Sequence, residues 1–395
     1  MMNNKNTTAS RSRVFDIIAC VLFCGIFLAF SVLTFALPDK DFSESENTVL
    51  TTLDDVFGGN VAKKLFSGEL TESAARYLRH QFPLREKALM LRSVADMALV
   101  RYETSGVIYG ADGYLIPRKD FPKTDYLAGN LDAITALAGA LEGKGISSVF
   151  ALAPRPADVL EKYYPSAYSS LELKALREEV QKKYAPLDLT SVLKNAADKG
   201  EYVYYKTDHH WTTLGAYLAY ARIIAEYGET PVSLSEFERE TVSTEFLGTS
   251  HSLVLTPFTD YDTVEYFHRK NGNAFVCEMV YEGKTLDGFY DRTFLDKKDK
   301  YSSFMGGNYG LVHVSLESGE AREKMLVVKD SYANAMIPFL AEHFDLVIVD
   351  PRYYKDSVYK LAENEGCEYA LVLCSLDGLC DANTYLLLNY GLPKE

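Results

Sequence analysis

Residues 325–350 read MLVVKDSYANAMIPFLAEHFDLVIVD. Two apolar runs, MLVVK at 325–329 and DLVIVD at 345–350, enclose a segment with helical spacing, and the run YALVLC follows at 369–374. Short apolar runs that alternate with helices predict βαβ units, in which helices cover both faces of a mainly parallel sheet. We therefore expect an α/β fold with three layers, helix on sheet on helix.

The same alternation begins near residue 126. The expected elements are a helix at 128–142, a strand at Ser147–Ala153, a helix at 171–184, a short strand around Leu187, a helix ending at Ala197, a strand at Tyr202–Tyr205 and a helix at Leu214–Tyr227. Residues 231–320 interrupt this alternation and are rich in Thr, Tyr, Gly and Asn. We predict one domain at 126–395 that contains a β-rich insertion at about 231–320.

The N-terminal part of the chain carries a long apolar segment. Residues 17–37 contain no charged side chain, and Lys5, Arg11 and Arg13 precede them. At about 1.5 Å per helical residue this segment spans a bilayer core of roughly 30 Å. Basic residues before the segment favour an inside N-terminus. We predict a cytoplasmic tail at 1–13, a transmembrane signal anchor at 14–37 and an extracytoplasmic remainder of a single-pass protein of the cell membrane.

Two other interpretations of this segment fit the residues less well. A cleaved signal peptide has a shorter apolar stretch and an A-x-A-like site, and neither is present. The residues Ile17–Cys20 resemble a lipoprotein box, but little apolar sequence precedes them. Residues 38–125 are expected to form a polar tether and an N-terminal helical cap, with helical spacing at 59–102 and a hairpin turn at Asp112–Gly113.

Composition excludes several classes of function. The chain has 41 Lys and Arg against 55 Asp and Glu, a net charge of −14, so a phosphate backbone would be repelled and no nucleic-acid partner is expected. No GxxxxGK[ST] or GxGxxG motif is present, and no cofactor is predicted. The exported cysteines are too few for a disulfide scaffold, although one C-terminal bridge stays open: Cys277, Cys367, Cys374 and Cys380.

The densest polar cluster is KTDHHWT at residues 206–212, between an expected strand and an expected helix. Ligand sites in open α/β sheets lie at the carboxyl ends of strands. Asp208 and His210 are two residues apart, so the carboxylate can orient the imidazole, as nucleophilic catalysis requires. The alternative is structural, with Asp208 as a helix cap and the histidines and Trp211 packed in the core.

A second turn carries a serine in an equivalent place. Asp330 and Ser331 follow the run 325–329 and precede a helix, where free backbone N–H groups stabilise developing negative charge. A serine at a helix start is also an ordinary N-cap. Gly307 and Asn308, in the turn before this strand, are candidate oxyanion donors or a simple turn, and Arg155 is a candidate anion holder or a plain loop arginine.

Metal binding is the competing use of the histidines. Asp208, His209, His210 and His251 could supply ligands. Adjacent histidines on an extended loop point apart, and neither HExxH nor CxxC accompanies them. We therefore predict no metal site.

The segment YYKTDHHWTTLGAYLAY at residues 204–220 resembles the DHHW-motif family of bacterial exported proteins. It is also similar to the broader alginate O-acetyltransferase group, whose domains resemble SGNH hydrolases. Supporting segments are GVIYGADGYLI (106–116), LAPRPADVLEKYYP (152–165), PLDL (186–189) and KDSYANAMIPFLAEHF (329–344). The resemblance covers nearly all of the chain from residue 39.

This resemblance implies an SGNH-like three-layer fold and an Asp208–His210–Ser331 triad that forms an acyl-serine. In the O-acetyltransferases the acyl group passes to a hydroxyl of a surface polysaccharide, and a membrane-bound acyltransferase supplies the donor. The chain departs from the SGNH pattern at Lys329, where a glycine often precedes the Asp–Ser pair. The glycine and asparagine oxyanion donors match the family only in part, at Gly307 and Asn308. Trp211 matches the tryptophan of the family's Asp-x-His-Trp motif, and Arg155 and Trp211 are the candidate substrate contacts.

Three functional hypotheses follow. The leading one is a membrane-anchored, outward-facing O-acyltransferase that acts on a cell-envelope or secreted glycan. The second is a carbohydrate esterase of the same fold, in which water accepts the acyl group. The third is a non-catalytic glycan-binding or envelope-assembly module, for which the 28 tyrosines could line a sugar groove.

Overall fold

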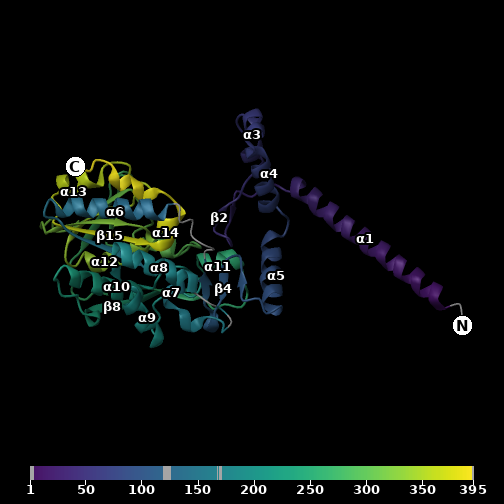
Figure 1. The fold of residues 1–395 in the computed structure, drawn as a ribbon, viewed down its shortest axis with the longest axis horizontal. Coiled ribbons are helices and arrows are strands. Elements are labelled where there is room, and N and C mark those ends of the chain that lie inside the picture. Colours follow the sequence, from purple (N-terminus) through teal and green to yellow (C-terminus); the bar gives the residue numbers. More distant parts are fainter. Residues whose placement is uncertain (1–3, 119–125, 167, 169–170, 394–395) are drawn as a thin grey trace. The chain divides into compact units, whose positions relative to one another are not determined.

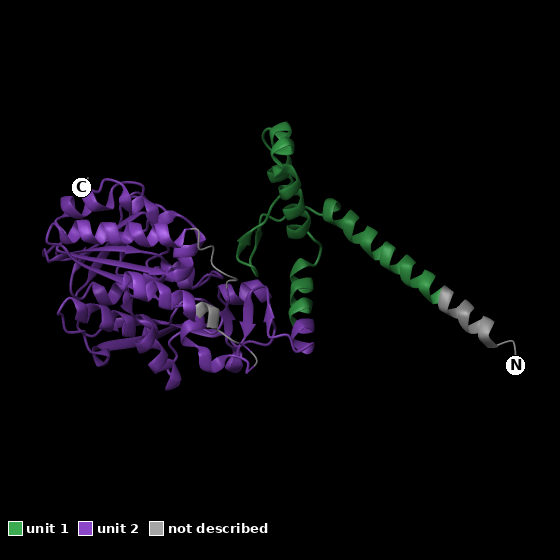
Figure 2. Cartoon of the chain, in the orientation of Figure 1, with its two compact units in different colours: residues 1–93 green, residues 94–395 purple. Residues whose placement is uncertain are grey.

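The structure is a computed structural model, and it describes residues 4–118, 126–166, 168 and 171–393. The chain divides into two compact units, residues 1–93 and 94–395 (Figure 2). Residues 94–118 therefore lie with the second unit, which also holds the sheet and the two candidate turns.

The first unit begins with the long helix α1 (Asn4–Ala36). Within it, Val14–Ala36 is long and apolar enough to cross a membrane, a property that a signal sequence in this position shares. The other elements of the unit are shorter, and those within residues 59–98 are helices, as the spacing expected at 59–102 predicts. These shorter elements are β1 (Phe42–Ser43), β2 (Thr48–Val49), α2 (Leu53–Phe57), α3 (Val61–Ser67), α4 (Glu69–His80) and α5 (Arg85–Ala98), whose last residues enter the second unit.

The second unit is built on an eight-stranded sheet in the order β11-β10-β12-β14-β13-β15-β6-β7. Its strands are β6 (Ser147–Ala153), β7 (Leu187–Asp188), β10 (Phe275–Met279), β11 (Lys284–Asp287), β12 (Leu311–Leu316), β13 (Lys324–Lys329), β14 (Asp345–Val349) and β15 (Tyr369–Ser375). Strands β13 and β14 are buried along nearly their whole length. Burial on both faces explains why they read as continuous apolar runs in the sequence.

The sheet is mixed, so the prediction of a mainly parallel sheet was wrong. Strands β14, β13, β15, β6 and β7 are parallel to one another. The other three pair antiparallel, β12 with β14, β10 with β12 and β11 with β10. Strands β10, β11 and β12 come from the expected insertion at 231–320. Part of that segment therefore extends the main sheet.

Helices cover both faces of this sheet, and each face has its own apolar core. Helices α9, α10 and α12 pack on one face, and α6, α8, α13 and α14 on the other, as Figure 1 shows for α10, α12, α6 and α13. The helices are α6 (Leu127–Glu142), α7 (Pro156–Val159), α8 (Leu171–Tyr184), α9 (Thr190–Asp198), α10 (Thr213–Glu226), α11 (Thr249–Val254), α12 (Ile337–Leu340), α13 (Val358–Glu365) and α14 (Leu376–Asp381).

Smaller elements complete the unit. The sheet β3-β4-β5 consists of β3 (Glu103–Thr104), β4 (Val107–Tyr109) and β5 (Leu115–Pro117), and the other small sheet pairs β8 (Phe237–Phe246) with β9 (Asp262–Arg269). The turn between β4 and β5 places Asp112 at φ 54°, in the left-handed region, as the predicted hairpin requires. The 3₁₀ helices used below are η5 (Tyr301–Ser303) and η6 (Ser331–Ala335).

The strand expected at Tyr202–Tyr205 is absent from the sheet among the residues described. Tyr204 forms only an isolated bridge with Trp211. The N–H of Tyr205 donates to the carbonyl of His210, and that of Thr212 donates to the carbonyl of Val203. Because the segment satisfies its hydrogen bonds within its own loop, its aromatic residues pack as a buried loop instead of a sheet strand.

Candidate active site

The candidate serine lies at the carboxyl end of β13, an inner strand of the sheet. Ser331 follows the end of β13, between the ends of its parallel neighbours β14 and β15. Asp330 fixes this turn: one carboxylate oxygen accepts the N–H of Tyr332 at 3.0 Å, and the other accepts the N–H and the hydroxyl of Ser375, both at 2.8 Å. Asp330, and not Ser331, is therefore the N-cap of η6. The serine hydroxyl is left for another partner.

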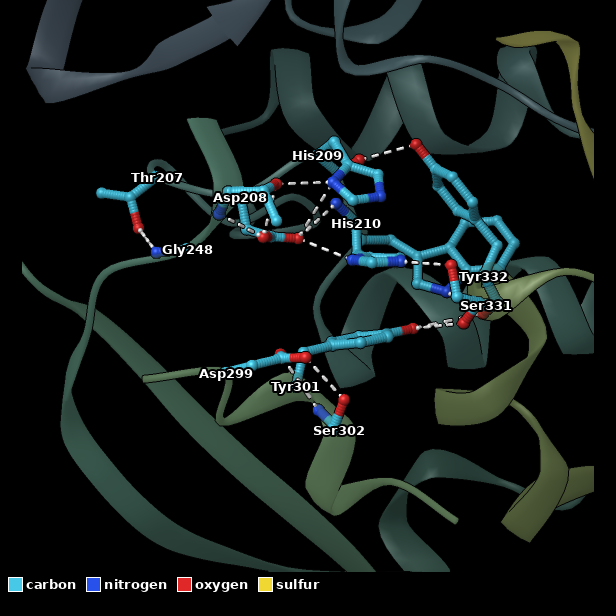
Figure 3. Close-up of polar contacts among 12 residues, drawn as sticks. Thr207, Asp208, His209, His210, Gly248, Asp299, Tyr301, Ser302, Ser331 and Tyr332 are labelled. Atoms are coloured by element: carbon cyan, nitrogen blue, oxygen red, sulfur yellow. Dashed lines mark hydrogen bonds and ion pairs between the residues drawn. The ribbon is translucent and has the colours of Figure 1, made fainter. Parts of the chain in front are cut away.

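That partner is His210 in the loop at residues 206–212, which we call the DHHW loop (Figure 3). The Nε2 of His210 lies 2.8 Å from the Oγ of Ser331, and its Nδ1 lies 2.6 Å from the carboxylate of Asp208. Asp208 also accepts the backbone N–H of His210 at 3.0 Å. Asp208 does not cap the following helix, because the N-cap of α10 is Thr212. The structure thus joins Asp208, His210 and Ser331 in one hydrogen-bonded chain.

The start of α11 supports Asp208 from behind. The N–H and the hydroxyl of Thr249 donate to Asp208 at 2.8 and 2.9 Å. Gly248 approaches so closely that a side-chain Cβ there would lie 2.4 Å from the Cβ of Asp208. Burial raises the pKa of Asp208, but His209, His210 and these hydrogen bonds outweigh it and lower the pKa below its ordinary value. Asp208 is therefore a carboxylate at neutral pH, and His210 carries its proton on Nδ1.

Asp262, the first residue of β9, holds the DHHW loop in place. Its carboxylate accepts the N–H of Lys206 at 2.7 Å, the N–H of Thr207 at 2.8 Å and the hydroxyl of Thr207 at 2.5 Å. The hydroxyl of Thr207 in turn accepts the N–H of Gly248 at 2.9 Å. Burial raises the pKa of Asp262, against these hydrogen bonds. One buried carboxyl therefore ties β9, the DHHW loop and the start of α11 together.

Aromatic rings enclose the histidine. The ring of Tyr301 in η5 stacks on His210 with centroids 3.8 Å apart and an interplanar angle of 8°. Its hydroxyl donates to the carbonyl of Ser331 at 3.0 Å. Trp211 is fully buried, and its Nε1 donates to the carbonyl of Tyr332 at 2.9 Å. The tryptophan thus supports the serine turn from inside the core, and its role as a substrate contact stays a prediction.

The turn before β12 also contacts the serine turn. The amide Nδ2 of Asn334 in η6 donates to the carbonyl of Gly307 at 3.2 Å and to the Oδ1 of Asn308 at 3.3 Å. Gly307 has φ 112°, in the region that favours glycine. The two candidate oxyanion donors thus stand beside the turn that carries Ser331, and their role stays a prediction.

Arg155 lies at the end of β6 and is 4% exposed. Its Nε lies 3.0 Å from the carboxylate of Asp158, and one terminal nitrogen lies 3.9 Å from Asp377. These acidic partners occupy the guanidinium, and its role as a holder of a substrate anion stays a prediction.

The arrangement also bears on metal binding. Ligand atoms of Asp208, His209 and His210 lie within 4.8 Å of one another. Both ring nitrogens of His210 are engaged, by Asp208 and by Ser331, and the Nδ1 of His209 lies 2.7 Å from the hydroxyl of Thr249. His251 is not part of the group, and burial lowers its pKa to about 4. Coordination by His210 would have to displace one of its two partners.

Several residues of this site were not predicted from the sequence: Gly248, Thr249, Asp262, Tyr301 and Asn334. They come from residues 248–301, inside the predicted insertion, and from the turn after Ser331. None belongs to a motif of fixed spacing, so only the fold reveals their position.

Known proteins resemble this chain over its central part. A family model described as "DHHW protein" matches residues 178–350, which confirms the resemblance drawn from the DHHW segment. The protein named probable alginate O-acetylase AlgJ from Pseudomonas aeruginosa is 26% identical over 178 residues, 42% of this chain and 44% of that protein. Its namesake from Azotobacter vinelandii is 22% identical over 267 residues, 64% of this chain and 62% of that protein. The chain spans about half the length of most of these curated relatives.

Two solved structures share the fold. A DHHW family protein from Eubacterium siraeum has a TM-score of 0.56 at 22% identity, with 74% of this chain and 98% of that chain covered. PatB1 from Bacillus cereus, solved with a sulfonyl adduct, has a TM-score of 0.60 at 21% identity, with 73% and 98% covered. At these identities the likeness establishes a mixed α/β fold of this type.

Proposed function

We propose that this chain, which resembles DHHW proteins over residues 178–350, is a membrane-anchored, extracytoplasmic O-acyltransferase that acetylates a cell-envelope or secreted polysaccharide. The observation that carries the proposal is the hydrogen-bonded chain from Asp208 through His210 to Ser331. The names of the AlgJ relatives support acetyl as the acyl group and a polysaccharide as the acceptor.

The geometry supports acylation of Ser331. With Nδ1–H held by the Asp208 carboxylate, the lone pair of Nε2 faces the serine hydroxyl at 2.8 Å. As the serine Oγ attacks the carbonyl carbon of an acyl donor, Nε2 takes its proton, and Asp208 stabilises the imidazolium. When the C–O bond to the leaving group breaks, Nε2 returns the proton to the leaving oxygen, and an acyl-serine remains. Donors from Gly307 and Asn308 would stabilise the tetrahedral oxyanion.

The second half of the reaction reverses these steps with a different alcohol. A sugar hydroxyl gives its proton to Nε2 while its oxygen attacks the acyl-serine carbonyl. Collapse of the tetrahedral intermediate breaks the bond to the serine Oγ, which regains the proton from Nε2. The product is an O-acetylated sugar and free Ser331. We propose a membrane-bound acyltransferase as the source of the donor, beside the helix Val14–Ala36.

Acylation is tested by incubating the full-length chain in detergent with p-nitrophenyl acetate and analysing its peptides by mass spectrometry. We expect an added acetyl group on the peptide that contains Ser331, and no such group in Ser331→Ala or His210→Ala. Ser318→Ala is the matched control, because Ser318 is an exposed serine in the loop after β12. A folded wild-type chain that is never acylated would overturn the proposal and favour the glycan-binding hypothesis.

The acceptor is tested in a second step. The isolated acetyl-enzyme is mixed with buffer alone or with an alginate oligosaccharide. Faster loss of acetyl from Ser331 with acetyl recovered on the sugar supports transfer. Equal loss in both mixtures, with acetate as the product, would identify an esterase instead.

A further inference from the structure

A buried lysine stands directly before the serine turn and takes no part in the chemistry above. Lys329 is the last residue of β13 and is 3% exposed. An ammonium group is costly to bury unless nearby groups accept its hydrogen bonds and balance its charge. The contacts of Lys329 therefore indicate what the lysine does.

Two asparagine side chains accept its hydrogen bonds. The Nζ of Lys329 donates to the Oδ1 of Asn308 at 2.9 Å and to the Oδ1 of Asn334 at 2.6 Å. The carboxylate of Asp350, which follows β14, lies 4.0 Å from the same nitrogen and balances its charge. Asp350 is itself paired with Arg352.

These contacts fix the orientation of both amides. An ammonium group has only donors, so each asparagine must turn its oxygen toward Lys329. The Nδ2 of Asn334 then donates to the carbonyl of Gly307 and to the Oδ1 of Asn308. The oxygen of Asn308 thus receives two donors, and its Nδ2 is turned away from Lys329 and Asn334.

The segment that carries Asn308 is held against the serine turn at both ends. Tyr301, at its start, donates to the carbonyl of Ser331 and stacks on His210. At its other end, Gly307 and Asn308 contact Asn334, which lies in η6 with Ser331. The side-chain amide of Asn308 is thus held beside the turn that carries Ser331, with its Nδ2 turned away from the lysine.

We propose that Lys329 is a positioning residue, which orients the amide of Asn308 so that its Nδ2–H donates to the oxyanion formed at Ser331. This inference rests on the proposed acyl-serine chemistry. Lys329 does not touch the substrate, and its effect reaches the reaction through Asn308. The lysine thereby acts from the position where SGNH proteins often carry a glycine.

The charges around Lys329 give this role a pH dependence. The pKa of Lys329 is lowered to about 8. Burial is the largest cause and Arg352 adds to it, while Asp350 and Asp330 act in the opposite direction. A neutral amine can accept as well as donate, so Asn308 is no longer held in one orientation above this pH. Acylation should therefore slow as the pH rises through about 8. In the unfolded chain the lysine has its ordinary pKa of about 10.5. The free energy of unfolding should therefore rise with pH between about 8 and 10.5, where only the unfolded chain keeps this proton.

The test measures the acylation rate constant and KM for p-nitrophenyl acetate by stopped flow. The variants of the full-length chain are Lys329→Met, Asn308→Ala, the double variant and Lys324→Met. Lys324 is the matched control, because it begins the same strand and pairs with Glu365 far from the serine. Loss of one oxyanion donor slows acylation by about 10²–10³-fold, so we expect this for Asn308→Ala and at least about tenfold for Lys329→Met, with KM unchanged.

The double variant separates positioning from a merely structural role. If Lys329 acts only through Asn308, the double variant is no slower than Asn308→Ala alone. The decline near pH 8 should also be absent in Asn308→Ala, which tests the same point if Lys329→Met does not fold. The inference would be overturned if the double variant were slowed by the product of the two single effects. It would also be overturned if folded Lys329→Met kept the wild-type rate and pH profile. In both cases Ser331 would still be acetylated. A wild-type chain without acetyl on Ser331 would overturn the proposed function as well.

Discussion

At the scale of single residues, the charge of Asp208 controls the state of His210. The carboxylate accepts Nδ1–H of His210 and is held ionised by the two histidines and by Thr249. An amide in its place can donate to Nδ1, which moves the imidazole proton to Nε2 and removes the base. We expect Asp208→Asn to slow acylation of Ser331 by about 10⁴-fold and also to lower Tm, because the amide leaves buried donors of His210 or Thr249 unpaired. Stopped-flow rates and thermal unfolding check this, and a loss below tenfold would contradict it.

Gly248 is the second residue where a single atom matters. A Cβ at this position would overlap Asp208 at 2.4 Å, so Gly248→Ala must push the carboxylate from its place. Forced overpacking destabilises by about 1–3 kcal/mol, and we expect slower acylation as well. Gly139→Ala is the matched control, because nothing lies within 4 Å of a Cβ there. Gly139 is exposed in the last turn of α6, and there this substitution should stabilise by about 0.5–1 kcal/mol. Equal unfolding free energies for both variants would contradict the argument.

Site residues that a local sequence pattern marks could be predicted, and residues that meet only through the fold could not. Asp208 and His210 lie two residues apart, and Ser331 follows an apolar run, so local pattern was enough to single out all three. Lys329, Asn334 and Asp262 support them through contacts between segments that are distant in the sequence, and isolated Lys, Asn or Asp residues give no pattern. The alkaline decline expected from Lys329 could likewise not be predicted before its burial was known.

At the scale of elements, β9 anchors the DHHW loop through one carboxyl. Asp262 accepts hydrogen bonds from Lys206 and Thr207 and from the hydroxyl of Tyr202. Asparagine keeps only one acceptor oxygen, so Asp262→Asn leaves buried donors unpaired. Each unpaired buried group costs about 1–3 kcal/mol. We expect the free energy of unfolding to fall by at least this amount and acylation to slow. Denaturant unfolding measures the first effect.

Asp260→Asn provides the comparison for that measurement. Asp260 is exposed and lies two residues before Asp262, so its substitution should stay within about 0.5 kcal/mol of wild type. If both variants unfold at the same denaturant concentration, Asp262 does not hold the loop in the way described.

The elements themselves were predicted unevenly, for physical reasons. Strands β13, β14 and β15 are buried on both faces, β6 is buried in its last three residues, and all four follow apolar runs that the sequence displays. Strands β10 and β12 pair antiparallel at one side of the sheet, and no periodicity states which sheet such strands join. The tyrosines at 202–205 have high strand propensity, yet tertiary packing places them in a loop. Long-range strand pairing therefore decided the antiparallel part of the sheet, and packing together with local hydrogen bonds decided the segment at 202–205.

At the scale of the whole molecule, the proposed function requires a definite orientation in the membrane. The proposed acceptor is a polysaccharide outside the cell, so the sheet edge with Ser331 must face outward. The basic residues Lys5, Arg11 and Arg13 precede the apolar segment, and such residues are retained on the cytoplasmic side. Orientation is thus a requirement of the proposed function, and the first thirteen residues are expected to set it.

This orientation can be measured with a membrane-impermeant maleimide on intact cells. Cys277, Cys367, Cys374 and Cys380 are buried, and Cys20 and Cys24 lie in the apolar helix, so the native thiols should label weakly. We expect Ser318→Cys to label in intact cells and Ser10→Cys only after lysis, because the N-terminal tail stays inside. Replacing Lys5, Arg11 and Arg13 by glutamate should make Ser10→Cys accessible in part of the protein, since the retained positive charge is what opposes its export. A mature protein that lacks residues 1–37 would show that the helix is a cleaved signal sequence. If Ser10→Cys were labelled in intact cells with the basic residues in place, the topology would be the opposite of the one predicted. Ser331 would then lie on the wrong side of the membrane for an extracytoplasmic glycan.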